Sequence, residues 1–376
     1  MKENDFPQHL IRSELEPINA YQPGKPRREI QREYDLDRMP VKLASNENPF
    51  SPPEFLEEVY REEFEKLNRY PDGGCFYLRQ ALAEEYDWPE EAIVLGAGSD
   101  EVLDCLAKTT LGPGKEVLTA NPAFLMYKID AQMMGATTIE VPVDDNFHID
   151  LEGMLENITD STRWICLANP NNPTSRYITE EELEDFLDQV PAHCLVIIDE
   201  AYFELMDQPD YPDGLQLLKS RGEDDPHLVV LRTFSKAYGL AGLRVGYGLM
   251  DPGLADQLNK VRPPFNLTRP SQAVACRALE NNHYLEEVRR VLTAEREKLV
   301  EELKGRGFNV VPPAANFMLV EVPGGQQAEA VCEELLKAGV IVRSMAPYGL
   351  ENHFRLSVGQ PEENNLFLRK LDKISE

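Results

Sequence analysis

One lysine of this chain occupies a setting in which its amine could act as a nucleophile. Thr233-Phe234-Ser235-Lys236 follows the apolar run Leu228–Leu231, and Arg244 comes eight residues after the lysine. The run is typical of a buried strand. A lysine just past such a strand is poorly hydrated, so its amine is neutral more easily and can form a Schiff base. The neighbouring hydroxyls and the arginine suit a phosphate group.

A Schiff-base lysine beside a phosphate site indicates pyridoxal phosphate as the cofactor. By itself the pattern also fits a lysine in a surface loop, which is the usual environment of this residue type. The cofactor prediction therefore depends on whether other parts of the chain supply the remaining contacts.

Two polar side chains after another apolar run could contact the ring of such a cofactor. Asp199 ends the run Leu195–Ile198, and Tyr202 follows three residues later. A carboxylate at this place could pair with a pyridinium nitrogen and keep it protonated, which makes the ring an electron sink. Tyr202 could form a hydrogen bond with the phenolic oxygen of the same ring. The alternatives are a turn-forming aspartate at a strand end and a half-buried core tyrosine.

A rigid turn and one aromatic residue could supply the remaining ring contacts. Asn172-Pro173-Thr174 could offer the amide of Asn172 to the same ring oxygen, although Asn-Pro also marks ordinary turns. Phe124 could stack on the ring face. A core phenylalanine at the start of a helix is the more common explanation for Phe124.

A turn that contains two glycines offers a second phosphate contact. Gly96-Ala97-Gly98-Ser99-Asp100-Glu101 lies between an expected strand and an expected helix, so its glycines and the first helical amides could hold a phosphate. It does not match a dinucleotide-binding fingerprint, because Glu101 stands where the third glycine is needed. An ordinary turn capped by Ser99 or Asp100 explains the sequence equally well.

Arg355 lies between apolar residues in the expected strand Phe354–Val358. An arginine in that environment needs a partner. A substrate carboxylate bound by both ends of the guanidinium group is one candidate, and an internal Asp or Glu is the other.

These residues follow apolar runs that alternate with amphipathic helices, which predicts an α/β fold with a mostly parallel seven-stranded sheet and crossover helices. In open α/β sheets, ligands bind at the carboxyl ends of the strands, so we expect the polar clusters to meet in one crevice. Helices are expected between most of the runs, at about 99–111, 123–135, 150–158 and 180–190. The runs are Ala92–Leu95, Glu116–Thr119, Thr137–Val143, Trp164–Leu167, Leu195–Ile198, Leu228–Leu231 and Val245–Met250.

The alternation of short apolar runs with amphipathic helices ends after Asp251. Two long helices, at about 270–282 and 284–304, precede strands and helices that predict a smaller α+β domain. The first forty residues are rich in proline and charge and read as an extended arm, which must lie against the body of the fold or a second subunit. We therefore expect an N-terminal arm at 1–40, a large domain that binds pyridoxal phosphate at 41–270, and a small C-terminal domain at 271–376.

The chain of 376 residues carries a formal net charge of −28, which argues against nucleic acid and anionic membranes as partners. The acids lie mainly at helical spacing beside apolar stripes, as on ordinary solvated helix faces, although salt adaptation would also give an acidic surface. The sequence shows no apolar run long enough for a membrane span and no secretory signal, and its six cysteines lack zinc-binding spacing. We expect a cytoplasmic protein without a metal.

Together these stretches resemble the fold-type I pyridoxal-phosphate aminotransferases, and most closely their histidinol-phosphate aminotransferase branch. The resemblance extends from about Tyr21 to the last helix, and it is more specific for the superfamily than for the substrate. It rests on Ala44-Ser45-Asn46-Glu47-Asn48-Pro49, Arg69-Tyr70-Pro71-Asp72, Gly98-Ser99-Asp100-Glu101, Asn171-Asn172-Pro173-Thr174, Asp199-Glu200-Ala201-Tyr202, Thr233-Phe234-Ser235-Lys236, Gly239–Gly246, Arg262-Pro263-Pro264-Phe265-Asn266 and Phe354-Arg355-Leu356-Ser357.

The resemblance implies a role for each cofactor residue. Lys236 is similar to the lysine that forms the Schiff base, and Asp199 to the partner of the ring nitrogen. Asn172 and Tyr202 resemble the residues that hold the ring hydroxyl, and Phe124 resembles the ring-stacking aromatic residue. The implied phosphate site consists of Gly98, Ser99, Asp100, Thr233, Ser235 and Arg244, with Tyr70 reaching in from the other subunit of a homodimer.

Substrate contacts are implied in the same way. Arg355 resembles the arginine that binds the carboxylate of the amino-acid partner. Tyr21 resembles part of the segment that covers the substrate, and Asn46 falls in a substrate-binding stretch. The chain departs from the family pattern at Ser175, where glycine usually follows Asn-Pro-Thr. If that position needs a positive φ, serine costs more than glycine would.

The implied activity is ping-pong transamination between an amino donor, histidinol phosphate, and a 2-oxo acid, 2-oxoglutarate. Lys236 would act as base and acid at Cα. An aromatic amino-acid aminotransferase and a threonine-phosphate decarboxylase remain open, because the same fold serves all three. Glu101 counts against a nicotinamide-dependent dehydrogenase, and the intact pair of Lys236 and Asp199 counts against a catalytically inactive homologue.

Overall fold

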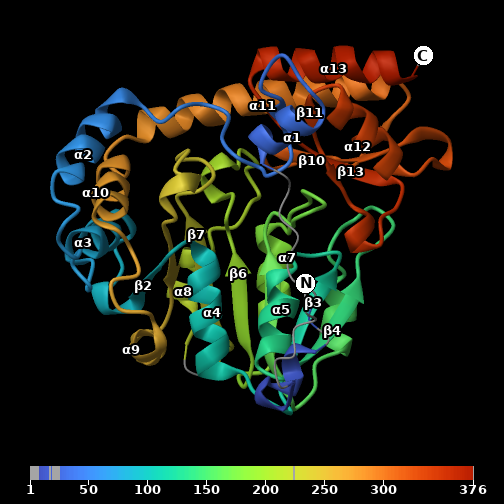
Figure 1. Ribbon diagram of the computed structural model, residues 1–376. Coiled ribbons are helices and arrows are strands. Elements are labelled where there is room, and N and C mark those ends of the chain that lie inside the picture. Colours follow the sequence, from blue (N-terminus) through green and yellow to red (C-terminus); the bar gives the residue numbers. More distant parts are fainter. Residues whose placement is uncertain (1–7, 17, 19–25, 223–224, 376) are drawn as a thin grey trace.

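The computed structural model describes residues 8–16, 18, 26–222 and 225–375, which form a large sheet domain and a smaller domain joined by a long helix (Figure 1). The large sheet has the strand order β2-β8-β7-β6-β5-β3-β4. The predicted mostly parallel, seven-stranded sheet is therefore confirmed. Its strands are β2 (Ile93–Gly96), β3 (Glu116–Asn121), β4 (Thr137–Pro142), β5 (Thr162–Ala168), β6 (Leu195–Asp199), β7 (His227–Thr233) and β8 (Gly246–Leu249).

One strand of this sheet runs against the others. β8 pairs antiparallel with β2 and with β7, whereas the remaining neighbours pair in parallel. The run Val245–Met250 thus differs from the expectation that it belongs to the parallel set. The reason is its connection: residues 234–245 contain only the 3-10 turn Ala241–Leu243, with no α-helix to carry the chain across the sheet.

Helices cover both faces of the sheet, because its central strands are apolar on both sides. All five residues of β6, for example, are buried. One face packs against α4 (Ser99–Thr110), α5 (Met126–Met133) and α9 (Pro252–Val261), and the other against α6 (Leu151–Glu156), α7 (Glu180–Leu187) and α8 (Gly214–Ser220). Neither α8 nor α9 is among the helices expected from the sequence.

The smaller domain contains a four-stranded antiparallel sheet of order β12-β13-β10-β9. α11 (Asn282–Gly305) runs across the top of Figure 1, from the side of the large domain that carries α10 (Arg269–Ala278) to this sheet. Phe317, Leu356 and Phe367 lie in the core that these elements enclose. The other elements are β9 (Asn309–Val310), β10 (Phe317–Glu321), α12 (Ala328–Lys337), β12 (Arg343–Ser344), β13 (His353–Ser357) and α13 (Pro361–Ser375).

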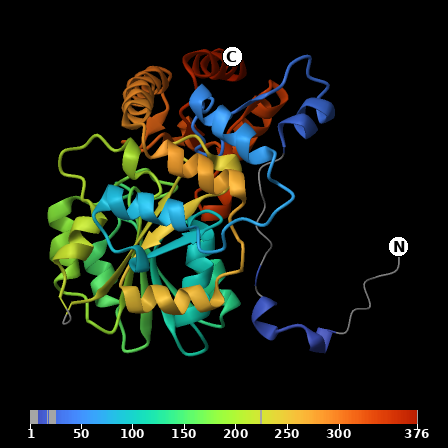
Figure 2. The same cartoon turned by 90° about the vertical axis from the view of Figure 1, so that its left-hand side faces the viewer.

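The segment before the large sheet is tied to the smaller domain. β1 (Val41–Lys42) pairs in parallel with β11 (Val340–Ile341). Within the predicted arm, the chain forms α1 (Arg27–Glu33) rather than an extended segment, because Ile30 packs on Ala44 and Ile341. Figures 1 and 2 both place α1 at the small-domain end of the molecule.

Three further helices, α2 (Glu54–Phe64), α3 (Phe76–Tyr86) and α10 (Arg269–Ala278), pack together at the β2 edge of the large sheet (Figure 1). Their exposed side carries several large apolar side chains. Among the described helices of the chain, none is long and apolar enough to cross a membrane.

Candidate active site

A cavity of about 450 Å³ lies at the carboxyl ends of the central strands. Its lining comes from the segments that follow β2, β3, β5, β6 and β7, so residues far apart in the sequence meet at one sheet edge. Every predicted cofactor residue except Tyr70 lines it. These residues are Gly98, Ser99, Asp100, Phe124, Asn172, Asp199, Tyr202, Thr233, Ser235, Lys236 and Arg244.

Lys236 reaches this cavity from the turn after β7. Its Nζ donates to the backbone oxygen of Ser45 at 3.2 Å and lies 5.6 Å from the centre of the Tyr202 ring. Burial, and then the positive charge of Arg355, lowers the pKa of Lys236 to about 8. At neutral pH a useful fraction of this amine is therefore uncharged, which a nucleophilic lysine requires.

Asp199 lines the cavity from the end of β6. Its Oδ2 accepts a hydrogen bond from the hydroxyl of Tyr127 at 2.8 Å, and its Oδ1 accepts one from the backbone N–H of Ala201 at 3.2 Å. Burial raises the pKa of Asp199 to about 6, and the Tyr127 hydrogen bond opposes this rise. Tyr127 is not among the residues predicted from the sequence to act in the site. It lies three residues after Phe124, which precedes α5, and the two rings meet edge to face at a centroid distance of 5.6 Å.

The residues predicted to bind the phosphate form a cradle of glycine, hydroxyls and one arginine. Gly98 has φ +88°, and a Cβ added there would lie 2.5 Å from Nη2 of Arg244. The distances from the Arg244 guanidinium to its partners are long: 3.4 Å to Oγ of Ser235, 3.3 Å to the backbone oxygens of Ala97 and Ala241, and 3.8 Å to Oδ2 of Asp100. Since α4 begins at Ser99, its first backbone amides also lie here. Such a cradle fits a dianion.

These three features together fit pyridoxal phosphate. The cofactor needs an amine for its aldehyde, a carboxylate for its ring nitrogen and a cradle for its phosphate. Lys236, Asp199 and the Gly98–Arg244 cradle supply one each around a single cavity.

Arg355 and Asn172 are in direct contact. Nη1 of Arg355 donates to Oδ1 of Asn172 at 2.5 Å, and Nη2 donates to the backbone oxygen of Ala44 at 2.8 Å. Both acceptors are neutral oxygens. Because the amide oxygen of Asn172 is engaged by the guanidinium, its NH2 group is the end left for the cavity, as the predicted contact with the ring oxygen requires.

The other predicted substrate residues lie in different surroundings. Asn46 is buried beneath the site, where its Nδ2 donates to the hydroxyl of Tyr202 at 2.9 Å, and it does not line the cavity. Tyr21 lies outside the described residues. Tyr70 is 79% exposed and stacks on Phe265 at 4.8 Å, so it does not enter the cavity of its own chain.

Ser175 does adopt the positive φ considered in the sequence analysis. Its φ is +61°, and the residue is fully buried. This left-handed conformation costs a residue with a side chain about 1–2 kcal/mol relative to glycine. The surrounding contacts must therefore compensate for it.

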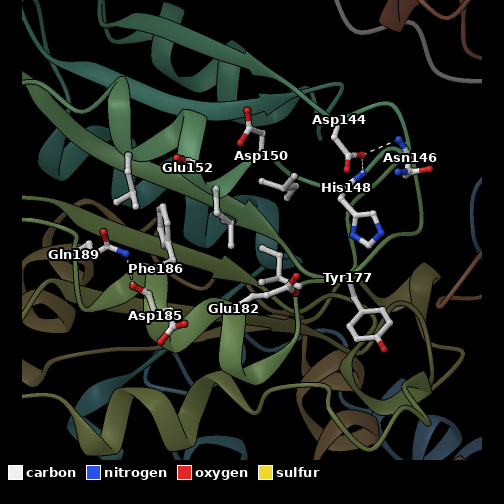
Figure 3. A pocket seen from close by; sticks show the side chains of 14 residues that line it. Asp144, Asn146, His148, Asp150, Glu152, Tyr177, Glu182, Asp185, Phe186 and Gln189 are labelled. Atoms are coloured by element: carbon white, nitrogen blue, oxygen red, sulfur yellow. Dashed lines mark hydrogen bonds between the residues drawn. The ribbon is translucent and has the colours of Figure 1, made fainter.

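A second hollow, of about 760 Å³, lies between α6, α7 and the loop at 144–150 (Figure 3). Its lining combines acidic side chains such as Asp150 and Glu182 with apolar ones such as Phe186, and it includes His148. Within it, Oδ1 of Asp144 accepts hydrogen bonds from the backbone N–H groups of Asn146 and His148. It shares no residue with the 450 Å³ cavity.

Comparison with known proteins identifies the family. The family model for aminotransferase class I and II matches residues 38–371. The chain belongs to this aminotransferase family. A histidinol-phosphate aminotransferase 2 of Pseudomonas fluorescens is 44% identical to it over 366 residues, which is 97% of each chain. One of Carboxydothermus hydrogenoformans is 41% identical over 368 residues, which is 98% of this aminotransferase and 99% of the relative.

Solved structures share the fold of this aminotransferase. The histidinol-phosphate aminotransferase of Sinorhizobium meliloti, in complex with pyridoxal 5'-phosphate, superposes with a TM-score of 0.86 at 27% identity and covers 97% of both chains. The fold-type I architecture expected from the sequence is therefore confirmed.

Proposed function

We propose that this aminotransferase binds pyridoxal 5'-phosphate and transfers an amino group between histidinol phosphate and 2-oxoglutarate. The observation that carries the proposal is the meeting of Lys236, Asp199 and the Gly98–Arg244 cradle around one cavity. The relatives named as histidinol-phosphate aminotransferases, at 44% and 41% identity over nearly the whole chain, support the amino donor. The cofactor in the Sinorhizobium structure supports pyridoxal phosphate.

Bound pyridoxal phosphate supplies an aldehyde that condenses with amines and a ring that withdraws electrons from the substrate Cα. Lys236 would hold the cofactor through Nζ, and its amine, when free, would carry a proton to and from the substrate Cα. The carboxylate of Asp199 would keep the ring nitrogen protonated. Asn172 and Tyr202 would hold the ring oxygen, and Phe124 would cover one ring face.

Arg355 receives the anionic part of each substrate. The guanidinium group matches a carboxylate in charge and shape, which suits glutamate and 2-oxoglutarate. Histidinol phosphate has no carboxylate, so its phosphate must be accepted in the same area. Asn46 acts on this region through Tyr202 rather than by direct contact.

We further propose that the active form is a cytoplasmic homodimer. The outer side of α2, α3 and the loops near them exposes apolar side chains, a pattern typical of protein–protein interfaces. They include Phe64, Leu67, Tyr70, Phe76, Tyr77 and Phe265. A second copy on this face would let Tyr70 reach the phosphate in the other subunit. The six cysteines are free thiols, which fits the reducing cytoplasm.

The amino donor can be tested by mixing the purified holoenzyme with histidinol phosphate, phenylalanine or threonine phosphate, each with 2-oxoglutarate. We expect rapid glutamate formation with histidinol phosphate and slow or no formation with the others. Turnover of phenylalanine alone would make the protein an aromatic aminotransferase, and carbon dioxide release from threonine phosphate would make it a decarboxylase.

A further inference from the structure

Ser175 forms a direct link between the two domains. It lies three residues after Asn172 in the loop that follows β5, and its left-handed conformation is unfavourable for a residue with a side chain. It faces Ala314 and Ala315, which belong to the segment between β9 and β10 of the smaller domain. A strained, fully buried residue at a domain contact beside the active site points to a functional constraint.

The hydroxyl oxygen of Ser175 accepts hydrogen bonds from the backbone of this segment. The backbone N–H of Ala315 donates to Oγ of Ser175 at 2.9 Å. The backbone N–H of Ala314 donates to the same oxygen at 3.2 Å and to the backbone oxygen of Ser175 at 2.9 Å. Glycine would keep the conformation and the backbone contact, but it would leave the buried N–H of Ala315 without this acceptor.

The same short segment is held from two other directions. Arg296 of α11 donates to the backbone oxygens of Ala314 and Ala315, the latter at 3.4 Å. Nδ2 of Asn316 donates to the backbone oxygen of Asn46 at 3.2 Å. We call residues 314–316 the clasp. It ties the smaller domain to the loop of Asn172 and to the loop of Asn46.

Arg355 contacts these same two loops. Its guanidinium donates to Oδ1 of Asn172 and to the backbone oxygen of Ala44. The smaller domain therefore meets each loop at two places, once through the clasp and once through Arg355. The position of the guanidinium relative to the Asn172 amide depends on both contacts.

We propose that Ser175 is a positioning residue that fixes the Asn172 loop on the smaller domain and thereby sets the anion-binding geometry of Arg355. The identity of the anion as the carboxylate of 2-oxoglutarate rests on the proposed function. The clasp itself depends only on the contacts described above.

The test compares Ser175→Gly with the wild-type holoenzyme. Glycine relieves the backbone strain while it removes the hydroxyl, so we expect an intact fold with an unchanged melting temperature. We expect KM for 2-oxoglutarate to rise about tenfold while kcat changes less than about threefold, the size of effect that the loss of one hydrogen bond gives. Ser161→Gly, at the opposite end of β5, is the matched control and should leave both constants unchanged.

Two readouts do not depend on turnover. Calorimetry with glutarate, a dicarboxylate that cannot react, should give a Kd about tenfold higher for Ser175→Gly than for the wild type. In cofactor-free protein, amide hydrogen exchange at Ala314 and Ala315 should be faster in Ser175→Gly than in the wild type. Ser175→Ala, which retains the strain, should show the same changes together with a lower melting temperature.

Unchanged glutarate affinity and unchanged exchange at the clasp in Ser175→Gly would overturn the proposal. A lower melting temperature with unaltered KM and Kd would also overturn it, because the role would then be structural only. If the wild type binds glutarate but does not turn over histidinol phosphate, the proposed amino donor is wrong, and a weaker glutarate affinity with faster exchange in Ser175→Gly would still support the role of Ser175.

Discussion

The hydroxyl of Tyr127 donates a hydrogen bond to Oδ2 of Asp199 at 2.8 Å, and both residues are buried. Burial raises the pKa of Tyr127, so the hydroxyl keeps its proton and remains a donor. The bond stabilises the ionised carboxylate against the cost of burial. In the proposed mechanism Tyr127 would therefore act on the cofactor ring through Asp199.

Tyr127→Phe should weaken catalysis in a way that depends on pH. Without the hydroxyl, the pKa of Asp199 should rise above its value of about 6, because the Tyr127 hydrogen bond is a cause that lowers it. More of the carboxylate is then protonated at neutral pH. We expect kcat to fall about tenfold at neutral pH and the acidic limb of the pH–rate profile to move to higher pH.

Tyr177→Phe is the matched control for this variant. Tyr177 donates to Oδ1 of Asp210 at the same distance, 2.8 Å, but that pair is exposed and does not line the cofactor cavity. Loss of the Tyr177 hydroxyl should leave the pH–rate profile unchanged. An unaltered acidic limb in Tyr127→Phe would show that the bond to Asp199 has no electrostatic role.

The uptake of pyridoxal phosphate by cofactor-free protein should depend on the protonation of Lys236. The amine reacts only when neutral, so the uptake rate should rise about tenfold per pH unit below the pKa of about 8 and level off above it. Stopped-flow absorbance of the bound cofactor measures this rate.

Arg355→Gln should move this midpoint to higher pH, because the charge of Arg355 is one cause that lowers the pKa of Lys236. Arg163→Gln, remote from the cavity, is the control and should not move it. A midpoint near the ordinary lysine value in the wild type would contradict the low pKa assigned to Lys236.

Hybrid dimers test whether Tyr70 serves the other subunit. Tyr70→Ala and Lys236→Ala homodimers should each be severely impaired. A mixed dimer combines one Tyr70→Ala subunit with one Lys236→Ala subunit. If Tyr70 of each subunit serves the site of the other, one of the two sites in this dimer has both Tyr70 and Lys236 intact. Random mixing should then restore about a quarter of the wild-type activity. No gain of activity in subunits proven to exchange would place Tyr70 in its own site or outside catalysis.

The ion pair of Glu200 and Arg232 should contribute to stability rather than to chemistry. Both side chains are fully buried, with 2.8 Å between Oε2 and Nη2. Glu200→Gln leaves much of a buried positive charge uncompensated, so it should lower the free energy of unfolding by about 3 kcal/mol in urea. Glu57→Gln in the exposed pair with Arg61 should cost less than about 0.5 kcal/mol. Equal costs would contradict this assignment.

Much of the fold and of the cavity could be predicted because local signals determine them. Each central strand is an apolar run, and polar residues such as Asp199 and Lys236 follow directly where the run ends. The parallel arrangement of the strands then brings these residues together. The family resemblance added roles for Asn172 and Arg355 that the residue types alone left open.

The remaining features depend on contacts between distant parts of the chain. Tyr127 lies 72 residues from Asp199, and in sequence it reads as one more core aromatic. The partners of the Ser175 hydroxyl are 139 and 140 residues away. The antiparallel direction of β8 depends on a connection without a helix, which its apolar composition does not reveal.

Reduction of the protein with borohydride after incubation with pyridoxal phosphate, followed by mass analysis of its peptides, shows directly whether Lys236 binds the cofactor. We expect one phosphopyridoxyl group, on Lys236. In Lys236→Ala we expect no visible cofactor band and no glutamate formation from histidinol phosphate and 2-oxoglutarate. Labelling of a different lysine, or wild-type turnover by Lys236→Ala, would contradict this role of Lys236.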